Sequence, residues 1–206
     1  MNQHRDVGRP RVFSDDAIFR ATNDLIERNS YDALTLEAIA TEVGCTRQAL
    51  VRRFGSKQAL LLAFLDRTLV LRAADYRIVE ANVPSPLAAL RARFVAPPEE
   101  RMEISADREI QANLLAFMLT SSGDPAFAAR FEALNQIYMD EMERLVRAAV
   151  EMGELAGIDP AALARALFSA SLGETVRWAS TPSNVPHVSR LGEIFDLLVM
   201  PHRLRS

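Results

Sequence analysis

Residues 35–57, TLEAIATEVGCTRQALVRRFGSK, decide the fold because they predict two short helices joined by a tight turn. Thr35 is suited to accept hydrogen bonds from the first backbone N–H groups of a helix, and Gly44 stands where a left-handed C-cap would end that helix. Thr46 is the expected N-cap of the second helix. From Gly44 to Lys57 the chain has four cationic side chains and no acidic one. The stretch therefore predicts a helix-turn-helix unit with a basic second helix.

Apolar side chains at three- and four-residue steps give each predicted helix one packing face. The two faces comprise Leu36, Ile39, Ala40 and Val43 in the first helix and Ala49, Leu50 and Phe54 in the second. Upstream, Ser14 is a further expected N-cap, and an apolar stripe follows it at Ile18, Ala21, Leu25 and Ile26. We therefore expect a third, supporting helix, and the three helices together form a helix-turn-helix DNA-binding domain in residues 13–60.

The side chains outside these faces are suited to DNA. Arginine can bond both acceptors of guanine and glutamine can bond adenine, each good pair giving about 1–3 kcal/mol of discrimination. Arg47 and Gln48, early in the second helix, are the candidate base readers. Residues 1–12 contain Arg9 and Arg11 and predict a basic arm, flexible without DNA, of the kind that enters a minor groove. The alternative is that these arginines are only solvated.

The order of these motifs resembles the TetR family of bacterial transcriptional repressors. The resemblance runs from GRPR at residues 8–11 through T-L-x-x-I-A-x-x-x-G to F-x-S-K-x-x-L, and it covers roughly residues 8–62. It implies an all-helical homodimer whose second domain binds a small molecule and so releases a DNA operator. By the same resemblance, the candidate DNA-contacting residues are Arg9, Arg11, Thr35, Thr46, Arg47, Gln48, Arg52, Arg53 and Lys57.

One pair of residues departs from the family pattern. The family commonly places aromatic residues where this chain has Val51 and Arg53. Arginine can replace an aromatic hydroxyl at the DNA backbone by its charge, whereas valine cannot. We therefore expect an altered site preference, and we keep as an alternative a helical dimeric module that binds small molecules or proteins without specific DNA recognition.

The rest of the chain predicts longer helices, in residues 61–206. Proline pairs break the chain near residues 84–86 and 97–98, and Asp-Pro starts at 124–125 and 159–160 begin two further helices. We expect one helix from residue 56 to about residue 82 and another that includes Met102. The whole chain is then all-α with about nine helices. The last two are the expected dimer surface, with small residues at Ala166, Ser169, Ala170 and Gly173.

The effector site is less sharply defined by the sequence. Aromatic and methionine side chains at helical spacing can line a cavity between helices or simply fill the core. The candidates are Phe64, Met102, Phe117, Met118, Phe131, Tyr138 and Trp178. Gln111, Asn113 and Asn135 are polar anchors only if they face inward, and surface positions are expected for them. Without a dense charge cluster in this half, the expected ligand is apolar or aromatic with one or two polar groups.

Composition sets limits on the remaining function classes. The 206-residue chain is 49% hydrophobic and has a net charge of −3, so affinity for DNA must come from a local basic patch. His4, His187 and His202 lack the spacing of metal ligands, and no Gly-rich phosphate loop is present, so we expect neither an enzyme nor a cofactor. Cys45 is expected to be structural, and the alternative is a redox-sensitive thiol whose pKa is lowered by Arg47. With no signal peptide, the expected compartment is the cytoplasm.

Overall fold

A computed structural model describes residues 13–29, 31–75, 83–95 and 107–204 of the chain, and these ranges are helical with no strand. These ranges contain nine α-helices, which are α1 (Asp15–Arg28), α2 (Leu36–Val43), α3 (Arg47–Phe54), α4 (Lys57–Asp75), α5 (Pro86–Val95), α6 (Arg108–Ser121), α7 (Pro125–Glu151), α8 (Pro160–Ser180) and α9 (His187–Val199). Two short 3₁₀ helices, η1 (Tyr31–Ala33) and η3 (Met200–His202), complete the described part. The predicted all-α class is confirmed.

The helices of the DNA-binding half begin where the capping residues predict. The Ser14 Oγ accepts from the Ala17 N–H at 3.2 Å, and the Thr35 Oγ1 accepts from Ala38 at 3.1 Å. Similarly, the Thr46 Oγ1 accepts from the Ala49 N–H at 3.2 Å. Each bond satisfies a donor that the first turn of a helix would otherwise leave without a partner. Local chemistry alone therefore fixes three helix starts.

Later helix boundaries agree with the predictions in part. Asp124 and Asp159 cap α7 and α8, each with proline as the first helical residue, as predicted. The helix predicted to include Met102 instead begins at Arg108 in the described residues, because the Asp107 carboxylate caps it. Met102 itself lies outside the described residues, as does the predicted end of α4 beyond Asp75.

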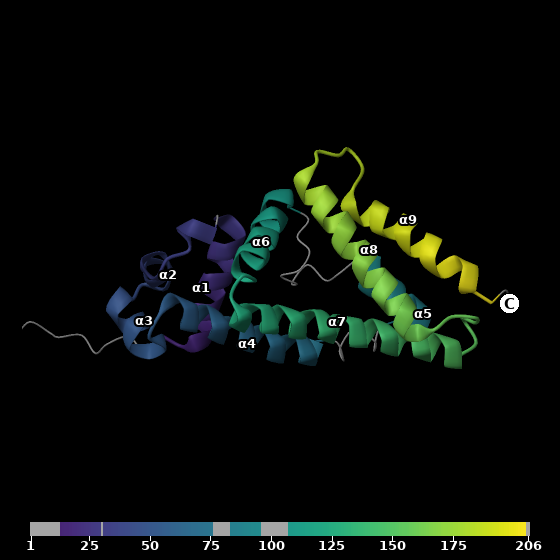
Figure 1. Ribbon diagram of the computed structural model, residues 1–206, viewed down its shortest axis with the longest axis horizontal. Helices are drawn as coiled ribbons and strands as arrows, with labels where there is room; N and C mark the ends of the chain where they lie inside the picture. Colours follow the sequence, from purple (N-terminus) through teal and green to yellow (C-terminus); the bar gives the residue numbers. More distant parts are fainter. Residues whose placement is uncertain (1–12, 30, 76–82, 96–106, 205–206) are drawn as a thin grey trace, which may run out of the picture.

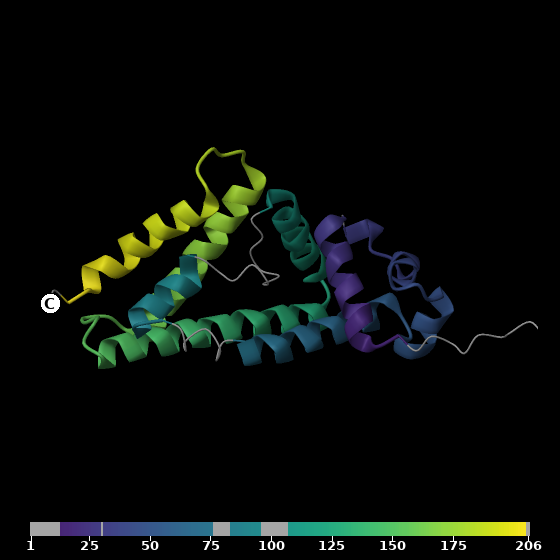
Figure 2. The ribbon, with the colours of Figure 1, turned by 180° about the vertical axis from the view of Figure 1, so that it is seen from behind.

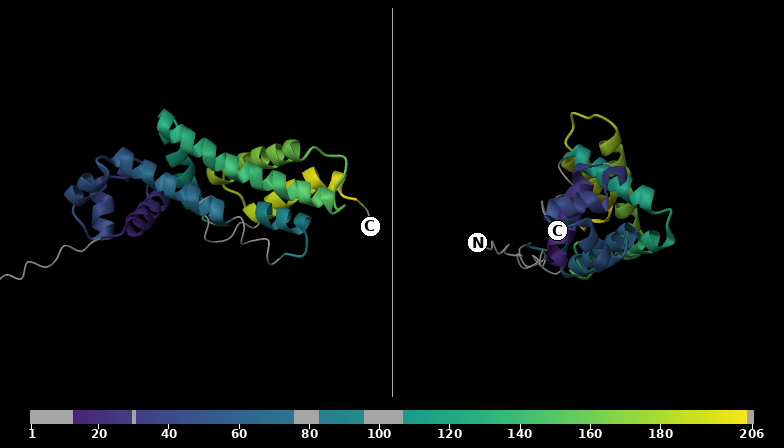
Figure 3. Two further views of the ribbon diagram at one scale, coloured as in Figure 1. Left: turned by 90° about the horizontal axis from the view of Figure 1, so that it is seen from below. Right: turned by 90° about the vertical axis from the view of Figure 1, so that its left-hand side faces the viewer.

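The molecule is elongated, with α1–α3 at one end and α5, α8 and α9 toward the other (Figure 1). Helices α4 and α7 pack together along its length and connect the two ends, as seen from below in Figure 3. Helix α6 packs on α1 and stands beside it in Figure 1. Seen from behind in Figure 2, α5 lies near the C-terminal end of α7 and contacts α9 as well.

Two clusters of buried apolar side chains form the core. The first joins α1–α4 to Phe117 of α6 and to Phe127 and Phe131 of α7. The second is built from α5, α7, α8 and α9. The boundary predicted between residues 60 and 61 falls inside the first cluster, because Leu60 and Leu61 are both fully buried in it. The helix-turn-helix unit therefore shares its core with the helices that follow it.

Candidate nucleic-acid interface and ligand cavity

The turn between α2 and α3 sets the position of the second helix. Gly44 has a φ of 76°, a left-handed conformation that glycine adopts without steric strain, and the Cys45 N–H donates to the Ala40 carbonyl at 2.8 Å. The inner faces of the two helices meet through Ile39 and Leu50, which are fully buried. This packing fixes which side of α3 faces solvent.

The solvent-facing side of α3 presents Arg47, Gln48 and Arg52. The Arg47 Nε lies 2.5 Å from the Glu37 Oε1 of α2, and 57% of its side chain remains exposed. An exposed ion pair of this kind contributes about 0–1 kcal/mol, so a nucleic acid can replace it at little cost. The two predicted base readers are therefore adjacent and accessible, on a helix that is anchored by its buried Leu50.

Arg53 has a different environment from its neighbours on α3. Its guanidinium lies 2.7 Å from the Asp15 carboxylate and donates to the Phe13 carbonyl at 2.5 Å, so it ties α3 to the start of α1. Val51 is half-buried and packs against the first cluster. The two residues that depart from the family pattern thus make contacts inside the domain. A DNA contact by Arg53 stays a prediction, and it would require the Asp15 pair to open.

The predicted phosphate contacts lie at helix N-termini. Thr35 and Thr46 cap α2 and α3, and Lys57 is the first residue of α4. The Lys57 Nζ lies 4.5 Å from the centre of the Tyr31 ring, a cation–π contact, and burial lowers the pKa of this amine. Free backbone N–H groups at such ends suit an anion. Arg9 and Arg11 of the predicted arm lie outside the described residues.

Cys45 is a free cysteine in the turn between α2 and α3. It is half-buried in the turn, and burial raises the pKa of the thiol. This direction is opposite to that of the redox-sensitive alternative, and the Arg47 guanidinium is paired with Glu37. A raised pKa keeps the sulfur protonated and weakly nucleophilic, in keeping with the expected structural role.

A cavity of about 170 Å³ lies where the two core clusters meet, between α4, α6, α7 and α8. Its walls are lined by Leu65, Thr68, Arg72, Gln111, Leu114, Leu115, Phe117, Met118, Phe131, Leu134, Asn135, Tyr138, Phe168, Ser171, Leu172 and Thr175. Four predicted ligand-binding residues are among them: Phe117, Met118, Phe131 and Tyr138. The structure thus brings together aromatic side chains from two helices that sequence spacing alone could not place.

Two other candidates lie elsewhere. Phe64 is buried in the first cluster, with its ring centre 6.3 Å from that of Phe19. Trp178 stacks on His187 with 4.8 Å between ring centres. Neither lines the cavity, because each faces a different neighbouring helix, and Met102 lies outside the described residues.

The polar part of the cavity differs from the prediction. Gln111 is buried and lines the wall with Asn135, although surface positions were expected for both. Asn113, in contrast, donates from its side-chain amide to the Glu27 carbonyl of α1 at 2.8 Å. Sequence reasoning missed Arg72, a buried cation on the cavity wall. The signal was the i, i+3, i+7 spacing of Leu65, Thr68 and Arg72, which puts all three on one face of α4.

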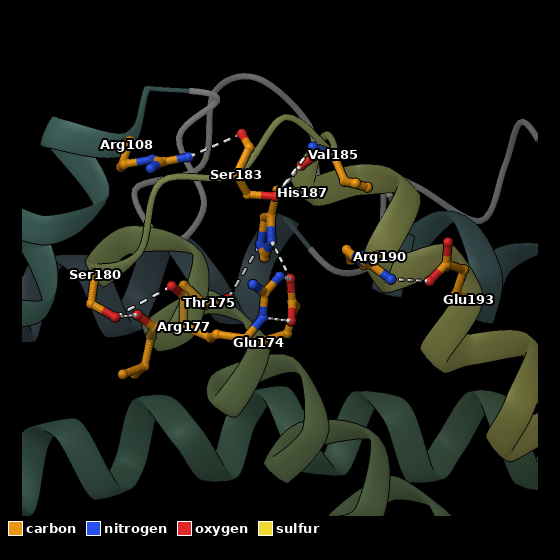
Figure 4. Close-up of polar contacts among 11 residues, drawn as sticks. Arg108, Glu174, Thr175, Arg177, Ser180, Ser183, Val185, His187, Arg190 and Glu193 are labelled. Atoms are coloured by element: carbon orange, nitrogen blue, oxygen red, sulfur yellow. Dashed lines mark hydrogen bonds and ion pairs between the residues drawn. The ribbon is translucent and has the colours of Figure 1, made fainter.

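A buried polar cluster lies beside this cavity, where α8 leads into α9 (Figure 4). His187, expected in a loop, is instead the first residue of α9 and is 6% exposed. Its Nε2 lies 3.3 Å from the Thr175 Oγ1, and its Nδ1 lies 3.9 Å from the Glu174 Oε1. Burial lowers the pKa of His187, with Arg177 acting in the same direction and Glu174 opposing it.

This cluster predicts a pH dependence of stability. Because the pKa of His187 in the folded protein lies below its ordinary value of 6.5, the unfolded chain takes up the proton first as the pH falls. Stability should therefore decrease as the pH drops below about 6.5 and level off below the folded-state pKa. Urea unfolding between pH 5 and pH 8 measures this change in the free energy of unfolding. A hydrogen bond from Arg177 lowers the pKa of Glu174 below 4.5, which keeps that carboxylate ionised throughout this range.

The matched variants are His187→Gln and His202→Gln. The first should flatten the pH dependence over this range, whereas the second, at a half-buried site in η3, should leave it as in the wild type. An unchanged slope in His187→Gln would contradict the assignment.

The described residues hold no group of three His, Cys, Asp or Glu side chains placed to bind a metal ion. Nor does any helix among them have the length and apolar character needed to cross a membrane.

One part of the chain is similar to a known family of proteins. Residues 18–64 match the family described as "Bacterial regulatory proteins, tetR family". This range spans α2, the turn and α3, and it includes every described candidate DNA contact. Residues 18–64 are therefore similar to the DNA-binding part of this family.

Several individual proteins match a longer part of the chain than residues 18–64. The regulator RutR of Escherichia coli strain K12 is 29% identical over 144 residues, which cover 70% of this chain and 65% of RutR. The chain therefore matches less than two thirds of the length of that relative. A TetR transcription regulator from Haloarcula marismortui has a TM-score of 0.77 at 19% identity, covering 92% of this chain and 98% of its own. A Saccharomonospora viridis regulator in complex with choline has a TM-score of 0.76 at 18% identity, covering 93% and 98%. Both solved structures share the fold.

Proposed function

We propose that this protein is a sequence-specific DNA-binding transcriptional regulator, a repressor that a small molecule releases from a palindromic operator. The observation that carries the proposal is the exposed Arg47–Gln48 pair at the start of α3. These two side chains lie on a helix whose start, inner face and preceding turn are all fixed by buried or capping contacts. The family match over residues 18–64 supports the same role.

A homodimer through α8 and α9 would supply the two-fold symmetry that a palindromic operator needs. Ser169 and Gly173 of α8 are exposed on one face, which permits another helix to approach closely. Val176 on the same face and Leu197 on α9 are large apolar side chains exposed to solvent in the single chain. An exposed apolar surface of this kind is typical of protein interfaces. Pairing of these two helices with their copies would cover it.

If a bound ligand is to release the DNA, the cavity must be in contact with the DNA-binding half. Phe117 lines the cavity, and its ring centre lies 6.0 Å from that of Tyr31 in η1. Tyr31 in turn lies beneath the Lys57 amine, the predicted phosphate contact. A ligand that displaces the Phe117 ring would therefore shift the support of Lys57 at the start of α4. The hydrogen bond from Asn113 of α6 to the Glu27 carbonyl of α1 is a second contact between the helix that carries Phe117 and the DNA-binding half.

The test is selection of genomic DNA fragments by the purified chain and by its Arg47→Ala variant at near-physiological salt. We expect one palindromic motif from the wild type, with a preference at one base pair weakened in the variant by about 1–3 kcal/mol. Fluorescence anisotropy of selected and mismatched duplexes measures the difference.

A matched control exists on α7. Arg147 is 58% exposed and lies 2.5 Å from Glu143, as Arg47 is 57% exposed and lies 2.5 Å from Glu37. Arg147→Ala should leave the selected motif unchanged. If neither the wild type nor the control selected any motif, specific DNA recognition would be rejected in favour of a module that binds small molecules or proteins.

A further inference from the structure

One polar side chain on the cavity wall has no partner inside the described part of the protein. Asn135 of α7 is half-buried and lines the cavity, and its side-chain amide makes no hydrogen bond among the described residues. Phe131 lies one helical turn before it and Tyr138 one turn after it, and both line the same wall. The amide therefore offers two N–H donors and one acceptor to a ligand held among aromatic side chains.

The other polar side chains of the wall are engaged within the protein. Thr68 and Ser171 each donate to a backbone carbonyl of their own helix, at 3.0 Å and 2.9 Å. The Thr175 Oγ1 lies 3.3 Å from the His187 Nε2. Three further polar side chains also interact with other residues, and these are Arg72, Gln111 and Tyr138. Recognition of a polar group in this cavity therefore centres on Asn135.

The position of Asn135 within its helix supports a role in binding. Asparagine is unfavourable inside a helix, because its short side chain competes for nearby backbone groups and prefers caps and turns. Two other asparagines inside described helices, Asn23 and Asn113, each donate a side-chain hydrogen bond of 2.8 Å within the protein. Asn135 lies inside the 27-residue α7 and gains no such contact. A bound ligand would supply the missing partner.

The apolar part of the wall limits the size of the ligand. Phe117 and Phe131 meet edge to face, with ring centres 5.9 Å apart and an interplanar angle of 82°. The cavity volume of about 170 Å³ is close to that of an engineered apolar cavity of about 150 Å³ that binds benzene. A body about the size of one ring fits this space.

From these observations we propose that the effector is an uncharged amide about the size of one ring, paired edge to edge with the Asn135 side chain. The ligand carbonyl accepts from the Asn135 Nδ2, and the ligand N–H donates to the Asn135 Oδ1. A carboxylate lacks the donor for this pair, and an ammonium group lacks the acceptor. This proposal rests on the proposed ligand-binding role of the cavity and names the class of its ligand.

The test measures binding of three probes of one size to the full chain by isothermal titration calorimetry. Benzamide has the donor and the acceptor, acetophenone has the acceptor only, and benzoate has acceptors and a charge. Because acetophenone leaves the Asn135 Oδ1 unpaired, benzamide should bind about tenfold more tightly than acetophenone. It should also bind more tightly than benzoate, which loses the hydration of its charge in an apolar cavity. Equal binding of benzamide and acetophenone, tighter binding of benzoate, or no binding of benzamide at millimolar concentration would overturn the proposal.

Variants locate the site on α7. Asn135→Leu should reduce the affinity for benzamide to that for acetophenone, whereas Gln136→Leu, at the exposed neighbour bonded to Asp140, should retain the preference. Leu134→Trp, which fills the cavity, should abolish binding of both probes. If Asn135→Leu fails to fold, Asn135→Ala introduces the best helix-forming residue and should show the same loss of preference. A preference for benzamide that survives both changes at Asn135 would place the amide contact elsewhere and overturn the proposal.

DNA binding is measured in parallel with the selected fragment, so that the two proposals fail separately. Specific DNA binding without a preference for benzamide would reject only the ligand class. Benzamide binding that depends on Asn135, in a chain that selects no DNA motif, would reject the repressor and leave the amide site standing.

Discussion

Phe127→Ala is expected to lower the free energy of unfolding by about 3–5 kcal/mol, although the residue lies in α7, outside the helix-turn-helix unit. Phe127 is buried in the cluster that contains Ile39 of α2 and Leu50 of α3. Its ring also stacks on Phe131, with 6.5 Å between centres. Removing the ring leaves a cavity inside a core that both halves of the molecule share.

Urea unfolding followed by two signals measures both the loss and its extent. Circular dichroism reports all helices, whereas the fluorescence of Trp178, the single tryptophan, reports α8. Because the first cluster joins the two halves, the two transitions should coincide in the wild type and shift together in Phe127→Ala. Leu119→Ala, at an exposed leucine of α6, should change stability by no more than about 0.5 kcal/mol. Two separate transitions would show that the halves fold independently.

The DNA-binding half was predictable because its signals are local. A cap such as Thr46 acts on an N–H group three residues away, and the conformation of Gly44 depends on a single residue. Periodicity then identifies the inner face of each short helix, as the burial of Leu50 confirms. None of these features requires knowledge of how distant helices cross. The pairing of Arg53 with Asp15 does require it, and for that reason the sequence did not indicate this contact.

The cavity was predictable only in part, because its wall depends on which way each helix is turned. Phe64 and Leu65 are adjacent in α4, yet Leu65 lines the cavity and Phe64 faces α1. One residue corresponds to about 100° of rotation around a helix, and the apolar pattern of α4 is too continuous to resolve it. The spacing of Arg72 from Leu65 and Thr68 puts it on the same face of α4, but its residue type indicates solvent, because an arginine near the end of a helix is usually solvated.

Val176→Glu is expected to have the largest effect on DNA binding without touching the DNA-binding half. Val176 is 43% exposed in the single chain, so the substitution should leave the fold of the monomer intact. In a dimer through α8 and α9, the same change would bury an unpaired carboxylate at the interface, which is strongly unfavourable. Sedimentation velocity should therefore show monomers.

The loss of the two-fold dimer should also weaken binding to a palindromic DNA site. A dimer binds its second half-site at a high effective concentration, so the loss of dimers should weaken binding to a palindrome by about 10²- to 10⁴-fold. Affinity for an isolated half-site should stay unchanged, because Arg47 and Gln48 lie on α3. Met152→Glu, at an exposed methionine just after α7, provides the control and should remain dimeric. If Val176→Glu stayed dimeric with full affinity for the palindrome, the two-fold contact would have to involve another face. An exposed valine that tolerates a charge in the dimer cannot lie at the centre of the dimer interface.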